Sequence, residues 1–135
     1  METVIISNTE DRVIQFGIAE PERYITGGDT DTDPWWNVCV FVKKPGIEIN
    51  AMAEAMTTLE LLELSRVIKE TRRKNDHKNI YVDFMEPDYA FDISGLHGIL
   101  HINLRYADSL DIWLTKENMD DIANYIDAKI EQSNS

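Results

Sequence analysis

Apolar residues recur along the chain with two different periods, and the order of those periods predicts the architecture. Short apolar or alternating segments rich in β-branched and aromatic residues are typical of strands. Eight such segments occur, at residues 3–7, 12–18, 35–43, 47–54, 80–84, 89–93, 99–106 and 110–114. Apolar residues spaced three and four apart, typical of amphipathic helices, occur in two longer segments, after Thr57 and after Thr115. The predicted order is four strands, a helix, four strands and a second helix.

Both predicted helices carry signals for where they begin and which face they bury. In the first, Thr57 and Glu60 have the spacing of a capping box, in which each side chain satisfies a free backbone N–H of the other residue. This helix is expected to end near Asn75, after several basic residues that favour the negative end of the helix dipole. In the second, Thr115 is the expected cap, and the apolar stripe consists of Met119, Ile122, Ala123, Ile126 and Ile130.

Short turns separate most neighbouring strands, which predicts antiparallel pairing. Because 43% of the 135 residues are hydrophobic, residues 1–135 are expected to form a single domain with its own core. We therefore predict an α+β fold, with a mainly antiparallel, strongly twisted sheet of about eight strands and two amphipathic helices that cover one of its faces. Pro87, between Glu86 and Asp88, predicts a sharp structural turn between the fifth and sixth strands.

The chain is strongly acidic, and this limits the partners that it can bind. It has 13 basic and 25 acidic residues, a net charge of −12 and a pI near 4.5. This balance argues against binding to nucleic acid or to an anionic membrane surface, and it favours a cationic protein partner. Cys39 is the single cysteine, the N-terminus lacks a signal-peptide pattern, and no apolar run approaches the length of a membrane span. These features predict a cytoplasmic protein.

An acidic segment that contains Asp29, Asp31 and Asp33 has the carboxylate spacing with which a calcium-binding loop begins. That loop requires a glycine directly after the third acidic residue and a glutamate at its end. Here Pro34 takes the place of the glycine, and the terminal glutamate is missing. We therefore predict that the segment binds no metal and faces solvent or a partner.

The other candidate chemical groups also have structural explanations. His97 and His101 have the spacing of two helical metal ligands, but they lie in a predicted turn and strand, where four residues span about 13 Å. Glu86 and Asp88 flank a proline in a turn, where aspartate commonly bonds to the backbone. The chain has no glycine-rich phosphate loop, nucleophile elbow or zinc-ligand set. We predict a protein without enzyme activity, catalytic residues or a cofactor.

Trp35 and Trp36 open the third predicted strand. Neighbouring side chains in a strand point to opposite faces, so one indole should enter the core while the other faces outward or lies under the acidic segment. Tryptophan is enriched in binding hot spots, and an acidic rim around an aromatic anchor suits a basic partner. Two aromatic residues that stabilise the loop-to-strand junction are an equally good explanation. The candidate partner-binding residues are Asp29, Asp31, Asp33, Trp35 and Trp36.

Three motifs together resemble the WapI-type immunity proteins over most of the chain, from about Arg12 to Ile130. The motifs are Trp36-Asn37-Val38, Thr57-x-x-Glu60-Leu61 and Phe84-x-Glu86-Pro87-Asp88-x-x-Phe91. Members of this family are small bacterial cytoplasmic proteins that neutralise the toxic C-terminal domain of a contact-dependent, WapA-like toxin, in several cases a nuclease acting on tRNA. The family pattern places an acidic residue near the tryptophan, which Asp33 supplies, whereas the doubled tryptophan departs from it.

The resemblance implies an immunity protein that binds a cognate toxin domain and blocks it through electrostatic and aromatic complementarity. The family has no catalytic residues to transfer to this chain. The main alternative is a small acidic ligand-binding or complex-assembly domain, in which the acidic surface serves solubility only. An enzyme that uses carboxylates is a third, minor possibility.

Overall fold

The computed structural model describes residues 2–20, 33–75, 77–104 and 109–134, which contain the eight strands and two helices in the predicted order. The elements are β1 (Thr3–Thr9), β2 (Arg12–Ala19), β3 (Trp35–Lys44), β4 (Ile47–Thr57), α1 (Thr58–Lys74), β5 (Ile80–Val82), β6 (Tyr89–Ile93), β7 (His97–Ile102), β8 (Leu110–Thr115) and α2 (Lys116–Ser133). All strand pairs are antiparallel. The α+β fold class and the antiparallel pairing are therefore confirmed.

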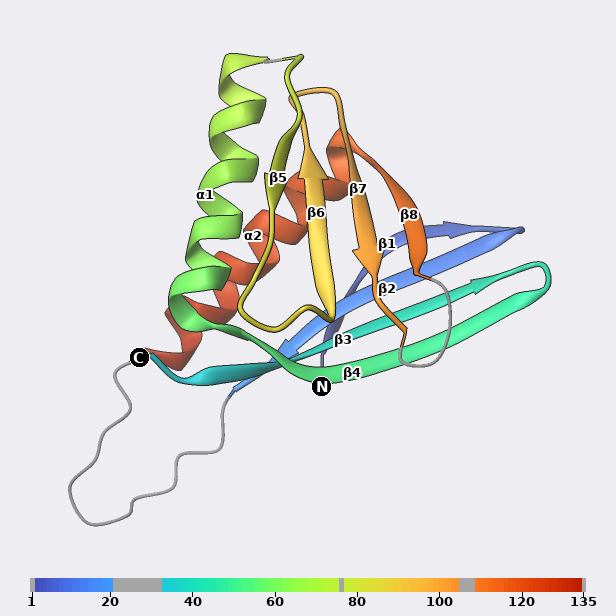
Figure 1. Cartoon of the computed structure of the whole chain (residues 1–135), viewed down its shortest axis with the longest axis horizontal. Coiled ribbons are helices and arrows are strands. Elements are labelled where there is room, and N and C mark those ends of the chain that lie inside the picture. Colours follow the sequence, from blue (N-terminus) through green and yellow to red (C-terminus); the bar gives the residue numbers. More distant parts are fainter. Residues whose placement is uncertain (1, 21–32, 76, 105–108, 135) are drawn as a thin grey trace, which may run out of the picture.

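The strands form two separate sheets of four, and not the single sheet of about eight strands that the sequence predicted. The first sheet has the order β1-β2-β3-β4 and the second has the order β5-β6-β7-β8. Helix α1, which is 17 residues and about 25 Å long, follows β4 and carries the chain away from the first sheet. In Figure 1 the strands of the first sheet run across the lower part of the molecule, α1 lies beside the second sheet, and α2 passes behind it.

One continuous core joins the two sheets and both helices. Inward-facing side chains of β2 and β3, such as Phe16 and Val40, belong to the same buried cluster as Phe91 of β6. The hydroxyl of Tyr89, on β6, donates a buried hydrogen bond to the carbonyl oxygen of Val38, on β3, at 3.1 Å. This bond fixes the second sheet against the first. The predicted stripe of α2 is buried: Met119, Ile122, Ala123, Ile126 and Ile130.

Both helices begin at the caps that the sequence predicted. The Thr57 hydroxyl accepts from the backbone N–H of Glu60 at 3.2 Å, and the Glu60 carboxylate accepts from the N–H of Thr57 at 3.0 Å. Thr115 forms the same reciprocal pair with Asn118. Helix α1 ends at Lys74 and is capped by Asn75, whose φ of +50° places it in the left-handed region that often terminates helices. None of the described helices is long and apolar enough to cross a membrane.

Two predicted strands end earlier than expected. Strand β5 ends at Val82, and β7 ends at Ile102. Beyond β7, the N–H of Asn103 donates to the carbonyl of Asp88 at 2.9 Å, which ties the segment after β7 to the turn between β5 and β6.

Candidate protein-binding surface

The structure places the predicted partner-binding residues in different environments. Asp29 and Asp31 lie outside the described residues. Asp33 accepts a hydrogen bond from the N–H of Leu59 at 3.0 Å, so its carboxylate satisfies a free donor in the first turn of α1. Trp36 is only 2% exposed and lies in the core, whereas Trp35 is half-buried on the opposite face of β3. Trp36 is therefore the inward indole, and Trp35 is the outward one.

The motifs that carry the family resemblance meet at the start of α1. Trp36 Nε1 donates to Thr58 Oγ1 at 2.9 Å, which joins the first motif to the helix. One oxygen of Glu60 completes the capping box, and the other accepts from the N–H of Met85 at 2.9 Å, which joins the helix to the third motif. The side chains of Leu59 and Met85 point outward beside these bonds and are exposed. The motif residues therefore have structural roles at this junction.

A second surface of functional interest is the outer face of the second sheet. Alternate side chains along β6, β7 and β8 are buried in the core, and the intervening ones belong to the opposite face of the sheet, together with Tyr81 of β5. We call six residues of this face the aromatic face: Tyr81, Asp92, His97, His101, Asp111 and Trp113. Sequence reasoning considered only the two histidines of this group. The alternation of the strands could have identified which of these side chains face outward, but not which ones meet.

Two large aromatic side chains dominate the aromatic face. Tyr81 is 60% exposed and Trp113 is 51% exposed. The His97 ring stacks on the Trp113 indole, with the ring centroids 4.2 Å apart and the planes within 15° of parallel. The centroid of the Tyr81 ring lies 6.2 Å from the centroid of the His101 ring. The histidines thus hold the aromatic rings in place while leaving much of their surface in solvent.

His101 lies between two carboxylates, one on each neighbouring strand. Its Nε2 is 2.6 Å from an oxygen of Asp92, on β6, and its Nδ1 is 2.6 Å from an oxygen of Asp111, on β8. Partial burial lowers the pKa of His101, but the hydrogen bonds and charges of Asp92 and Asp111 outweigh burial, so its pKa is raised. Both ring nitrogens can donate only in the imidazolium form. In that form the three side chains carry a net charge of −1.

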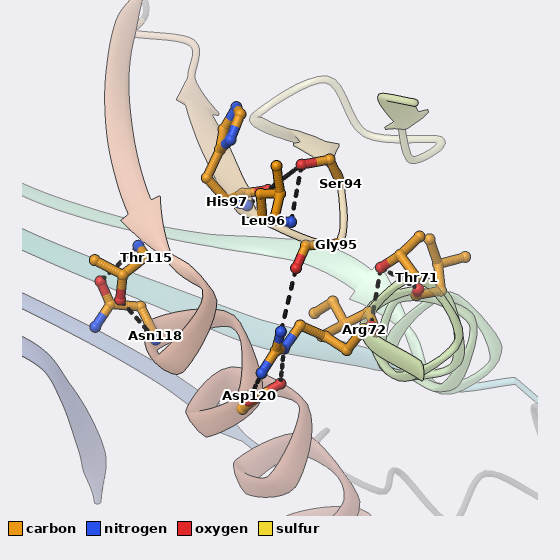
Figure 2. Close-up of polar contacts among 11 residues, drawn as sticks. Thr71, Arg72, Ser94, Gly95, Leu96, His97, Thr115, Asn118 and Asp120 are labelled. Carbon is orange, nitrogen blue, oxygen red and sulfur yellow. Dashed lines mark hydrogen bonds and ion pairs between the residues drawn. The ribbon is translucent and has the colours of Figure 1, made fainter. Parts of the chain in front are cut away.

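The turn before β7 positions His97, and α1 holds this turn. Figure 2 shows that Arg72 of α1 makes a two-pronged ion pair with Asp120 of α2, with N–O distances of 2.9 and 3.0 Å. A further Arg72 nitrogen donates to the carbonyl of Gly95 at 3.2 Å. The Ser94 hydroxyl accepts from the N–H of His97 at 3.3 Å. The aromatic face is therefore built on packed elements, as an interface with a rigid partner requires.

The chemistry of the aromatic face suits recognition. The described part of the chain contains no group of three or more histidine, cysteine, aspartate or glutamate side chains placed to hold a metal ion. Both nitrogens of His101 are already engaged by carboxylates, so neither offers a free lone pair. Exposed tyrosine and tryptophan beside carboxylates can bind arginine or lysine side chains by stacking and by ion pairing.

A small pocket lies elsewhere, between the end of β2 and the end of α2. Its volume is about 230 Å³, and its lining residues are Ile18, Ala19, Glu20, Trp36, Lys129 and Gln132. Ligand-binding pockets are usually about 300–1,000 Å³ and mostly apolar. The volume of this pocket is below that range. The structure therefore favours a protein interface at the aromatic face over a small-molecule site in this pocket.

Comparison of the chain with known protein families, with curated proteins and with solved structures found no match. The resemblance to the WapI-type immunity proteins therefore stays a prediction, which rests on the three motifs at the start of α1. The hydrogen bonds of these motifs hold the fold together at that junction.

Proposed function

We propose that this protein is an immunity protein, which binds a cognate bacterial toxin domain with nuclease activity and neutralises it without catalysing a reaction. The observation that supports the proposal most is the aromatic face, where exposed Tyr81 lies opposite Asp92 and exposed Trp113 follows Asp111 on the same face of β8. Tryptophan and tyrosine are the residues most enriched in interface hot spots, together with arginine. A partner arginine could stack on the indole and pair with the Asp111 carboxylate, which is 61% exposed.

The net charge of −12 supports the same kind of partner. A nuclease binds its substrate phosphates through basic side chains, and an acidic protein is attracted to that surface over distances up to the Debye length, about 10 Å at 0.1 M salt. Such attraction raises the association rate more than it slows dissociation. An acidic inhibitor that covers the basic cleft would compete directly with the nucleic acid.

The test is binding and protection against the toxin domain encoded beside this gene. We expect the protein to restore growth to cells that express the toxin domain and to bind it in surface-plasmon measurements. Trp113→Ala should raise the dissociation rate about 10-fold or more, because hot-spot truncations cost about 2 kcal/mol. Ile5→Ala is the matched control, because Ile5 is 50% exposed on the first sheet, and it should leave the rate within about 2-fold.

Two results would contradict the proposal in different ways. Failure to bind or to protect against the neighbouring toxin domain would refute the immunity function and favour the ligand-binding or complex-assembly alternative. If Trp113→Ala bound normally and Trp35→Ala dissociated faster, the immunity function would still hold. The interface would then lie at the start of β3, where the sequence predicted it, and not on the aromatic face.

A further inference from the structure

The two sheets have four end strands, and three of them are short or bonded along their free edge. Strand β5 has only three residues. On β1, the Asn118 side chain of α2 donates to the carbonyl of Ile6, at a bulge in the strand. On β8, Arg12 donates to the carbonyl of Trp113. These contacts are typical ways in which proteins keep a sheet edge from pairing with another chain.

Strand β4 is the exception among these end strands. It has 11 residues, pairs with β3 on one side, and no described strand pairs with its other side. All eight residues from Ile47 to Glu54 are exposed or half-exposed, in a regular alternation over most of that length. The strand contains no lysine or proline, the residues that most often protect an edge. Within the described part of the chain, the backbone N–H and C=O groups on this outer edge therefore have no strand partner, and they can pair with an added strand.

The side chains of β4 indicate which added strand would fit. Glu48 and Glu54 are exposed on the same face of β4, six residues apart, with Asn50 and Met52 between them. Opposite charges directly across two paired strands stabilise the pair, and like charges destabilise it. An antiparallel strand with basic side chains at the two facing positions would therefore pair best.

A second copy of this chain fits the same edge poorly. Antiparallel pairing of two β4 strands about Ala51 matches residues 47–55 of both copies, and it places Glu48 of each copy opposite Glu54 of the other. This register creates two like-charge pairs. Each copy also carries a net charge of −12. The two glutamates thus oppose self-association and leave the edge open to basic strands.

We infer that the outer edge of β4 is a docking site for an extended strand of a partner protein that carries two basic side chains six residues apart. Backbone hydrogen bonds would supply the binding free energy, and Glu48 and Glu54 would supply the selectivity. The inference concerns a surface separate from the aromatic face, and it holds whether or not the partner is a toxin.

The first test uses peptides derived from β4 itself. The probe has the sequence of residues 47–55 with the substitutions E48K and E54K, so antiparallel pairing about Ala51 sets each lysine opposite a glutamate of the protein. The natural segment is the first control. A second control has glutamine at positions 48 and 54 and lysine at positions 50 and 52. This peptide has the same net charge as the probe, but its lysines do not face Glu48 and Glu54.

We expect the probe to bind at least about 10-fold more tightly than either control in fluorescence titrations, with an affinity that falls as salt increases. Amide hydrogen exchange should slow in residues 47–54 and nowhere else on the protein. Equal affinity of the three peptides, or protection at another site, would overturn the inference.

The second test changes the protein and needs no peptide. Glu54→Lys places a lysine opposite Glu48 of a second copy and so turns both like-charge pairs into opposite-charge pairs. We expect this variant to form a dimer in sedimentation equilibrium at concentrations where the natural chain and Glu131→Lys do not. Glu131, exposed on α2, is the control for the same change in net charge. A Glu54→Lys variant that sediments like Glu131→Lys would show that the edge does not pair.

Discussion

Removal of the Tyr89 hydroxyl should measure how strongly the two sheets are held together. Tyr89 is 2% exposed, and its hydroxyl donates to the carbonyl of Val38 at 3.1 Å. Tyr89→Phe keeps the ring and removes only this donor. A buried acceptor left without any partner costs about 1–3 kcal/mol, whereas the net loss of one hydrogen bond costs about 0.5–1.5 kcal/mol.

The lower range applies to this site. Val38 lies in a central strand, between Ile18 of β2 and Ala53 of β4, where its carbonyl keeps access to a partner in the sheet. We therefore expect a loss of about 1 kcal/mol in the free energy of unfolding, and a fall in Tm of about 3 °C for a domain of this size. Because burial raises the pKa of Tyr89, its hydroxyl stays protonated and able to donate at neutral pH.

Urea unfolding at neutral pH is the assay, and Tyr81→Phe is the matched control. Tyr81 is 60% exposed on the aromatic face, so the same chemical change there should alter the free energy of unfolding by less than about 0.5 kcal/mol. An unchanged urea midpoint for Tyr89→Phe, or equal losses for the two variants, would refute the role of this hydrogen bond.

Four further variants test other parts of the fold. Because the pKa of His101 is raised in the folded protein, its stabilisation is complete below the ordinary value of 6.5 and is lost as pH rises through the folded-state pKa. His101→Gln should therefore differ most from the natural chain in urea midpoints near pH 6, and least near pH 9. Trp36→Phe should cost about 2 kcal/mol by calorimetry, because it removes buried volume and a hydrogen bond, whereas Trp35→Phe should cost less than about 0.5 kcal/mol. Thr57→Ala should cost about 1 kcal/mol in urea unfolding, because it removes a helix cap.

The parts of the fold that the sequence predicted well are those set by local interactions. The helix starts follow from Thr57 and Thr115, because a cap needs only residues three apart. The number and order of the strands follow from apolar alternation and from the breaks between segments. The inward direction of Trp36 was not predictable, because alternation states that neighbouring side chains diverge but not which of them meets the core.

The number of sheets depends on pairing between distant strands, which alternation alone does not determine. Strands β4 and β5 are separated by a 17-residue helix and are not neighbours in a sheet. Each group of four strands instead pairs in chain order. Local patterns of polar and apolar residues are the same for one sheet of eight strands and for two sheets of four.

The carboxylate–histidine group illustrates the same limit at the level of a site. Asp92, His101 and Asp111 come together because His101 faces Ala90 across one ladder and Asp111 across the other, with Asp92 diagonally adjacent. A shift of one residue in either register would turn a partner to the opposite face of the sheet. The sequence places all three residues in strands, at positions whose side chains face away from the core. Which of these side chains contact one another depends on the strand registers, and only the folded structure defines those.

The structural roles of the resemblance motifs bear on where a partner could bind. Trp36, Glu60 and the backbone of Met85 are joined at the start of α1, so substitutions there would disturb the fold before they revealed an interface. The exposed side chains of the aromatic face carry no such role in the core. When it is protonated, His101 also lowers the cost of covering that face, because the imidazolium charge offsets one of the two carboxylate charges that a partner would remove from water. His101 contacts both carboxylates, but the Asp111 side chain is 61% exposed and the Asp92 side chain is 31% exposed, so Asp111 is the better placed of the two to accept from a basic side chain.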